Sequence, residues 1–290
     1  MRRAFLEHSG PIPFAHRGGA EEAPENTLAA FEAATALGYR YLETDVHVTA
    51  DGAVVAFHDS VLDRVTDRTG SIAALSLNQI READAGYAYS VDGGRSHPFR
   101  GRGLRIPTLS ELLERWPHAR VNIDVKTDST VQPLCDTLRA HDAFNRVCVG
   151  SFSDTRLARV RAVTHEAVCT SMGQRAAAMA FLASRAGRMP STHADCVQVP
   201  RRWRGVTVVD RLFVRGAHRA GLPVHVWTVN DEPTMTMLLD LGVDGVMTDR
   251  PRLLRSVLTQ RGQWSDAAPE DQHGEAGHNG PAPSRVPGES

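Results

Sequence analysis

The sequence predicts an α/β fold, specifically a (β/α)8 TIM barrel with an insertion after the second strand. Short apolar runs alternate with longer segments of helical periodicity, which is the pattern of βα units. There are eight such apolar runs, the number of parallel strands that closes this kind of barrel. A chain of 290 residues, 41% hydrophobic and 23% charged, has the size and the core material of one barrel domain.

The candidate strands are short apolar runs bounded by glycine, proline or polar residues. They span residues 12–16, 41–48, 120–126, 147–151, 167–170, 196–199, 223–228 and 245–248. The candidate helices between them span residues 27–37, 130–141, 154–163, 210–220, 232–241 and 251–260. Asn26 and Asp231 each precede a periodic segment, so we expect them to cap their helices.

The connection after the second strand is too long for a plain βα loop. Residues 54–57 predict an extra short strand, and residues 60–106 form an insertion that contains a Gly- and Arg-rich stretch. Long excursions at this end of a barrel commonly cover the substrate, which we expect here; a loop without a function is the alternative.

The composition changes after Arg261, so we assign residues 1–261 to the barrel domain. Residues 262–290 contain four prolines and five glycines, and apart from alanine their only apolar side chains are Trp264 and Val286. Such a segment cannot bury enough surface to offset the entropy of ordering it, and the sequence predicts a disordered tail.

Charge and cysteine content exclude several classes of protein. Lysine and arginine total 33 against 34 acidic residues, so no overall field attracts nucleic acid or an anionic membrane. Residues 1–10 lack the apolar core of a signal peptide, and no apolar stretch approaches the roughly 20 residues of a membrane span. The four cysteines form no CxxC pair, and we expect them to be reduced and mostly buried. These features predict a soluble cytoplasmic protein.

The second strand predicts an acidic interior. Its period of two places Glu43, Asp45 and His47 on one face and apolar residues on the face that packs on helices. The charged face therefore points into the barrel. Buried carboxylates cost several kcal/mol unless a cation or hydrogen bonds compensate them.

The third strand repeats this arrangement, because Asn122, Asp124 and Lys126 share one face. Three inward carboxylates against one lysine leave an excess of negative charge. Such a site suits a hard divalent cation that takes oxygen ligands. The alternative is a set of carboxylates held by buried arginines or lysines.

Two histidines follow strands at the end of the barrel where enzymes of this fold place their sites. His16 and Arg17 end the first strand, and the guanidinium of Arg17 offers a bidentate fork for phosphate oxygens. His58 comes shortly after the extra strand, followed by Asp59, which either orients His58 or caps a turn. Two histidines can supply the general base and the general acid that phosphodiester cleavage requires.

The last two strands are less informative. Trp227 has the strand phase of an inward residue, where it either stacks on a substrate or fills the barrel. Asn230 and the segment 248–251 are interpreted as turn and capping residues. The chain contains no GxGxxG, Walker A, GxSxG or HExxH motif.

Taken together, these segments resemble the glycerophosphodiester phosphodiesterase family. The matching stretches keep the order of the family and span residues 12 to about 256. They are His16-Arg17-Gly18, residues 24–27, residues 43–47 with Asp51-Gly52, His58-Asp59, residues 106–109, residues 124–126, residues 227–230 and residues 245–251.

The resemblance implies a TIM barrel that hydrolyses glycerophosphodiesters to sn-glycerol 3-phosphate and an alcohol with Mg²⁺ or Ca²⁺. It implies that Glu43, Asp45 and Asp124 hold the metal, and that His16 and His58 form the acid–base pair. It also implies that Arg17 and Lys126 contact the phosphate and that Trp227 lines the glycerol side. The long segment after His58 matches the insertion of the family.

One residue departs from the pattern of the family, which usually has glutamate where this chain has Asp124. The sphingomyelinase D-like phospholipases resemble this site and use aspartate there, so an enzyme that cleaves lysophospholipids or sphingolipids at the same bond is one alternative function. A barrel that binds glycerophosphodiesters without turnover is another. The presence of both histidines favours an enzyme, because a binding protein needs no acid–base pair.

Overall fold

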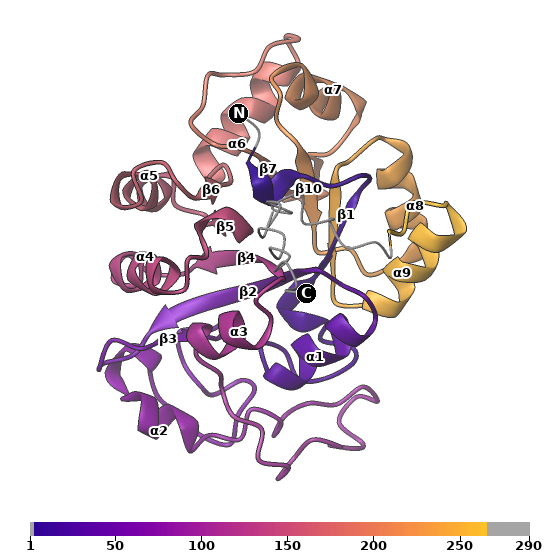
Figure 1. Ribbon diagram of the computed structural model, residues 1–290. Helices are drawn as coiled ribbons and strands as arrows, with labels where there is room; N and C mark the ends of the chain where they lie inside the picture. The colour runs from indigo at the N-terminus through magenta and orange to yellow at the C-terminus, as the bar shows by residue number, and fades with distance from the viewer. Residues whose placement is uncertain (1–2, 266–290) are drawn as a thin grey trace, which may run out of the picture.

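The computed structural model describes residues 3–265 and contains a barrel of eight parallel strands (Figure 1). These strands are β1 (Ile12–Ala15), β2 (Tyr41–Val48), β4 (Arg120–Val125), β5 (Val147–Gly150), β6 (Cys169–Thr170), β7 (Val197–Pro200), β10 (Val224–Trp227) and β11 (Gly245–Thr248). Their order is β6-β5-β4-β2-β1-β11-β10-β7. A parallel bridge between Ser171 and Cys196 joins the two ends of this path. The predicted barrel class is confirmed.

Helices surround the strands in the order expected of βα units. They are α1 (Leu28–Ala36), α2 (Leu77–Arg81), α3 (Leu109–Arg115), α4 (Val131–Ala140), α5 (Asp154–Val163), α6 (Gln174–Ser184), α7 (Arg211–Arg219), α8 (Glu232–Asp240) and α9 (Pro251–Gln260). Short 3-10 turns occur at Ala4–Leu6, His16–Gly18, Ile72–Ala74 and Phe144–Arg146. No helix within residues 3–265 is long and apolar enough to cross a membrane.

Three helices, α2, α3 and α6, were not predicted. The sequence of α6, Gln-Arg-Ala-Ala-Ala-Met-Ala-Phe-Leu-Ala-Ser, has little polar contrast between its faces, so no amphipathic stripe marks it. Its alanine content is the signal that would have revealed it, since alanine has the highest intrinsic helix propensity.

One of the two predicted caps is correct. The side chain of Asp231 accepts a hydrogen bond from the backbone N–H of Thr234 and caps α8. The cap of α1 is Thr27, not Asn26, because Thr27 accepts from the backbone N–H of Ala30. Asn26 adopts a left-handed conformation, with φ of 55°, and points its side chain at β2 instead.

The connection after β2 begins with β3 (Val54–Ala56), which is the predicted extra strand, one residue shorter than expected, and which pairs antiparallel with β2. The following residues pack around a small core of their own, which includes Phe57, Leu62, Ile72 and Ile80. No residue between 60 and 106 lines the main cavity, so the expected cover over the substrate is not present in this structure.

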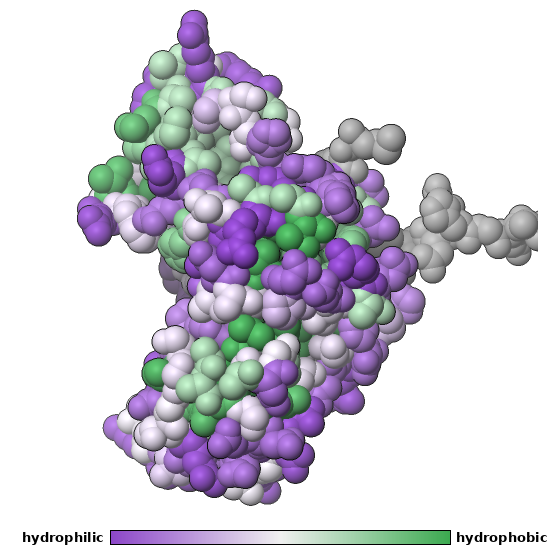
Figure 2. All heavy atoms as spheres, turned by 90° about the vertical axis from the view of Figure 1, so that its left-hand side faces the viewer, coloured by the Kyte–Doolittle hydropathy of each residue, from purple (hydrophilic) through white to green (hydrophobic). Residues whose placement is uncertain are grey.

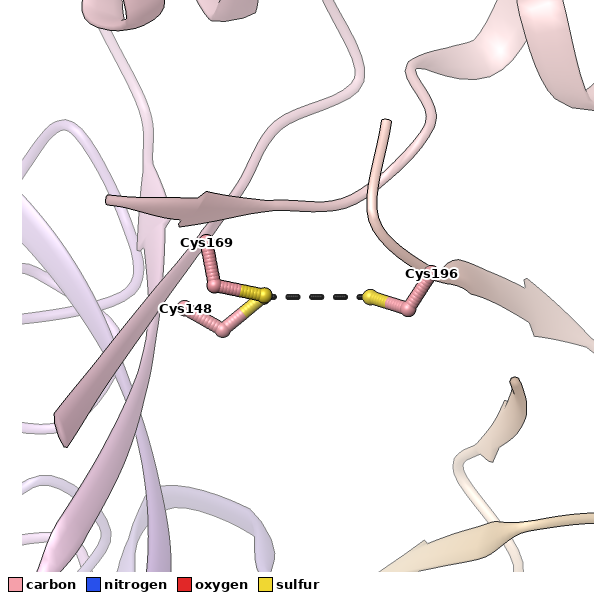
Figure 3. Close-up of side chains that lie close together, drawn as sticks. All are labelled: Cys148, Cys169 and Cys196. Carbon is pink, nitrogen blue, oxygen red and sulfur yellow. Dashed lines mark hydrogen bonds between the residues drawn. The ribbon is translucent and has the colours of Figure 1, made fainter. Parts of the chain in front are cut away.

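Most of the core lies between the sheet and the helices, in two large clusters. A third cluster fills the interior of the barrel with Phe5, Phe14, Tyr41 and three cysteines. Figure 3 shows these thiols, Cys148, Cys169 and Cys196, pointing toward one another. The Sγ atoms of Cys148 and Cys196 are 3.8 Å apart. All four cysteines, including Cys135, are free and buried, as expected.

The first residues of the predicted tail, 262–265, belong to the folded domain, because Trp264 packs against it. The ring of Trp264 packs edge-on against Tyr39 at a centroid distance of 5.2 Å, and the guanidinium of Arg255 lies over it. Trp264 also contacts both large core clusters. The rest of the predicted tail, residues 266–290, lies outside the described residues.

Candidate active site

The eight predicted site residues line one cavity of about 540 Å³. His16 follows β1, Glu43 and Asp45 lie in β2, and His58 follows β3. The others are Asp124 and Lys126 at the end of β4 and Trp227 at the end of β10. Arg17 follows His16 in a turn with φ of 53°. The cavity thus occupies the end of the barrel where enzymes of this fold place their sites.

His16 is held by a carboxylate. Its Nδ1 lies 2.6 Å from Oδ1 of Asp249, and the side-chain amide of Asn230 donates to the other oxygen of Asp249 at 2.7 Å. An ionised carboxylate only accepts, so Nδ1 of His16 carries the proton and Nε2 is the free nitrogen. Burial would lower the pKa of His16, but Glu43 and Asp249 outweigh it and raise the pKa.

His58 is held in the same way by its neighbour in the sequence. Its Nδ1 lies 2.5 Å from Oδ1 of Asp59, and Arg64 donates to the second oxygen of Asp59 at 2.5 Å. Arg64 also donates to Glu25 at 2.6 Å. Asp59 therefore orients His58, and the insertion contributes Arg64 as support behind the site.

The register between β2 and β4 brings Asp45 and Asp124 side by side. Nζ of Lys126 lies 2.6 Å from an oxygen of each carboxylate. Nε of Arg17 lies 3.0 Å from Asp45 without the geometry of a hydrogen bond. Burial alone would raise the pKa of Asp45, but Lys126 and Arg17 outweigh it and lower the pKa. These contacts match the alternative in which basic side chains hold the carboxylates.

Glu43 is less well compensated. It accepts a hydrogen bond from the backbone N–H of Arg17 at 2.9 Å and lies 3.8 Å from Nε2 of His16. Burial raises the pKa of Glu43 to about 7, and the charge of Asp45 adds to this effect. Burial also raises the pKa of Asp124. The acidic charge of the site thus exceeds what Lys126 and Arg17 stabilise.

The donor chemistry fits a hard divalent cation, because two buried carboxylates, Glu43 and Asp45, and the partly buried Asp124 line one cavity. The carboxylates do not meet at a single point, however. Within residues 3–265, only the cysteine cluster brings three possible ligand atoms within 4.8 Å of one another. The ammonium group of Lys126 lies between Asp45 and Asp124. A cation could be held by both carboxylates only if this ammonium group moved aside.

Several residues of the site were missed or misread in the sequence. Asp249 was interpreted as a capping residue, but the cap position of α9 is Arg250 and Asp249 binds His16. Asn26 donates to Asp45 at 3.2 Å and accepts from Thr44. Glu25 accepts from Arg17 at 3.0 Å. Asp249, Asn26 and Glu25 all lie within the stretches that resemble the family. That resemblance is the signal in the sequence that could have identified them as site residues.

Comparisons with known proteins identify the family to which the chain belongs. The model of the Glycerophosphoryl diester phosphodiesterase family matches residues 16–253, and the chain belongs to this family. Probable glycerophosphodiester phosphodiesterase 2 of Mycobacterium tuberculosis is 40% identical over 271 residues, which cover 91% of this chain and 96% of the relative. The activity of the chain is accordingly that of a phosphoric diester hydrolase that acts on glycerophosphodiesters.

Two solved structures share the fold. One from Silicibacter pomeroyi has a TM-score of 0.76 at 23% identity and covers 91% of this chain and 100% of its own. The other is an Oleispira antarctica phosphodiesterase in complex with the product sn-glycerol-3-phosphate. It has a TM-score of 0.69 at 25% identity, with 86% of this chain and 97% of that chain covered.

Proposed function

We propose that the chain hydrolyses glycerophosphodiesters to sn-glycerol 3-phosphate and an alcohol, with His16 and His58 as the acid–base pair. The observation that carries this proposal is that each histidine is anchored through Nδ1 to a carboxylate, Asp249 or Asp59, beside the same cavity. This arrangement fixes the tautomer and leaves Nε2 of both rings for proton transfer.

In the proposed reaction, one histidine accepts a proton from the nucleophile, either water or the 2-hydroxyl of the glycerol. A new P–O bond forms as the bond to the headgroup oxygen breaks, and the second histidine donates a proton to the departing alkoxide. If the 2-hydroxyl attacks, the cyclic phosphodiester is opened by water with the roles of the histidines reversed. Both routes consume one water and yield the same products.

Positive charge stabilises the transferring phosphoryl group. Lys126 and Arg17 reach the cavity beside the acidic residues, where they can bind the phosphate oxygens. Glu43, Asp45 and Asp124 would hold the divalent cation that the family uses, which supplies further neutralisation of the phosphoryl charge when bound. Trp227 at the end of β10 contributes an apolar surface for the glycerol carbons.

The product in the Oleispira antarctica structure supports the assignment of the bond that breaks. Hydrolysis on the headgroup side yields sn-glycerol 3-phosphate, whereas hydrolysis on the glycerol side yields glycerol and a phosphorylated headgroup. Phosphorus NMR of the products formed from glycerophosphocholine distinguishes the two, and formation of phosphocholine would overturn the proposal.

The residues are tested by comparing His16→Gln and His58→Gln with His218→Gln. His218 pairs with Asp244 away from the cavity and so carries the same chemistry as a control. We expect each of the first two variants to lower kcat for glycerophosphocholine by roughly 10²- to 10⁴-fold, the contribution of a positioned acid or base. KM of these two variants should change little, and His218→Gln should keep the kcat and KM of the parent protein. A site variant with near-normal kcat would make that histidine structural.

A further inference from the structure

The cavity has two halves of opposite character. The acidic half, from β1 to β4, carries the histidines, carboxylates and basic groups described above. The apolar half, from β5 to β10, is lined mainly by Phe152, Met172, Phe181, Trp203, Val206 and Trp227. Both halves line the same cavity, and within the apolar half the ring of Phe152 packs edge-on against Trp227, with the ring centroids 5.7 Å apart. One substrate can therefore reach both.

The outer wall of the apolar half is a hairpin that the sequence analysis did not identify. It consists of β8 (Arg202–Trp203) and β9 (Val206–Thr207). Its two turn residues, Arg204 and Gly205, have φ of 48° and 86°, as a two-residue turn between right-twisted strands requires. The register pairs Trp203 with Val206, so the two side chains lie on the same face of the hairpin.

Apolar side chains at the mouth of the cavity are left open to solvent. Phe152 is 49%, Trp203 41% and Val206 53% exposed. Figure 2 shows hydrophobic residues on the protruding upper part of the molecule, above a notch in its left-hand outline. Large apolar groups that face water around a binding cavity mark a surface that a ligand covers.

The chemistry of the apolar half favours a hydrocarbon over a charged headgroup. Among its lining residues there is no carboxylate, and the one charged side chain is that of Arg204. An aromatic surface can bind a quaternary ammonium group, but a neighbouring guanidinium opposes it. A short alkyl or acyl chain needs only the apolar contacts that this half provides.

We propose that this enzyme prefers phosphodiesters that carry an alkyl or acyl chain, and that the chain lies along Phe152, Trp203 and Val206. This inference rests on the proposed function of the acidic half. The chain has two possible sources, an acyl group on the glycerol or an alkyl alcohol as the leaving group. Burial of one methylene stabilises a complex by about 0.8 kcal/mol, which is roughly fourfold in kcat/KM.

The test compares kcat/KM for four soluble substrates below their micelle concentrations. They are glycerophosphocholine, glycerophosphoethanolamine, 1-hexanoyl-lysophosphatidylcholine and glycerophosphohexanol. We expect kcat/KM for at least one of the two substrates with a six-carbon chain to exceed that for glycerophosphocholine by tenfold or more. The one with the higher kcat/KM identifies the source of the chain. Equal values for all four would overturn the inference. A preference for choline over ethanolamine with no effect of the chain would also overturn it, in favour of an ammonium site.

The location is tested by the double variant Trp203→Ser/Val206→Ser. It should reduce the preference for the chain to less than threefold. Leu182→Ser is the matched control, because Leu182 on α6 is equally apolar and 68% exposed but does not line the cavity. It should leave the preference unchanged. If the double variant retains the full preference, the chain does not bind at the hairpin.

A binding measurement separates this inference from the proposed function. Calorimetry on the parent protein compares sn-glycerol 3-phosphate with its 1-hexanoyl ester. If the chain is an acyl group on the glycerol, the ester should bind at least tenfold more tightly and with a more negative heat-capacity change, as burial of apolar surface produces. Tighter binding without turnover of any substrate would refute the catalytic proposal alone. Turnover of glycerophosphocholine with equal binding of the two ligands and equal kcat/KM for all four substrates would refute the apolar site alone.

Discussion

Nδ1 of His16 lies 2.6 Å from Oδ1 of Asp249, although 233 residues separate them in the sequence. The closure of the barrel brings them together, because β1 pairs with β11 in a register that places Ala15 beside Thr248. His16 and Asp249 follow these residues directly. The pairing of the first and last strands thus positions one of the two proposed catalytic histidines beside its carboxylate partner.

Asp249→Asn should lower kcat by about 10²-fold with little change in KM. An amide can donate to Nδ1 and so stabilises the tautomer that leaves Nε2 protonated and unable to act as a base. The pH profile of kcat should change too, because Asp249 helps to raise the pKa of His16. Asp244→Asn is the control, since Asp244 holds His218 at 2.7 Å outside the cavity. A normal pH profile in Asp249→Asn would show that Asp249 only stabilises the fold.

Activity should depend on a divalent cation and on Asp124. Protein treated with EDTA should lose turnover and regain it with Mg²⁺, Ca²⁺ or Mn²⁺. Asp124→Asn removes a charge that a hard cation needs, so it should weaken metal affinity by tenfold or more, with partial rescue by excess metal. Asp124→Glu should stay partly active. The exposed Asp128, which pairs with Arg156, provides the control Asp128→Asn. Unchanged metal affinity in Asp124→Asn would remove Asp124 from the metal site.

Metal affinity should fall as the pH is lowered through 7. Burial raises the pKa of Glu43 to about 7, so below that pH the carboxyl group keeps a proton that competes with the cation. For one group with this pKa, affinity should decrease about tenfold from pH 8 to pH 6. Calorimetric titration at these two pH values measures the change. In Glu43→Gln the pH dependence should largely disappear, and a parent protein with constant affinity would contradict the prediction.

The thiols should be unreactive in the folded protein. All four cysteines are free and buried, three of them in the interior of the barrel. A water-soluble disulfide reagent should therefore modify fewer than one thiol per folded chain and all four after unfolding in guanidinium chloride. Rapid modification of several thiols without unfolding would show that the barrel interior opens readily.

The strand phase of the carboxylates could be predicted from the sequence, because alternation along a strand is a local property. Glu43, Asp45 and Asp124 face the cavity as expected. The partners of the histidines were harder to predict. The proximity of Asp249 to His16 depends on barrel closure, and the orientation of Asp59 depends on a side-chain rotamer; neither is encoded by local spacing.

The apolar half of the cavity was missed for a different reason. The hairpin strands β8 and β9 have two residues each, too short for a periodic pattern, and α6 lacks an amphipathic stripe. The Arg204-Gly205 turn is a weak signal by itself. Sequence analysis therefore found the charged residues of the site and overlooked the surface that we propose as the determinant of substrate preference.

The central claim is that His16 and His58 divide the roles of acid and base, and a change of leaving group tests it most directly. Glycerophospho-p-nitrophenol releases a phenolate that needs no proton, whereas glycerophosphocholine releases an alkoxide that does. The variant that lacks the acid should lose at least 10²-fold in kcat on glycerophosphocholine but less than tenfold on the nitrophenyl ester. The variant that lacks the base should lose at least 10²-fold on both. If neither His16→Gln nor His58→Gln loses less kcat on the nitrophenyl ester than on glycerophosphocholine, the division of roles is wrong.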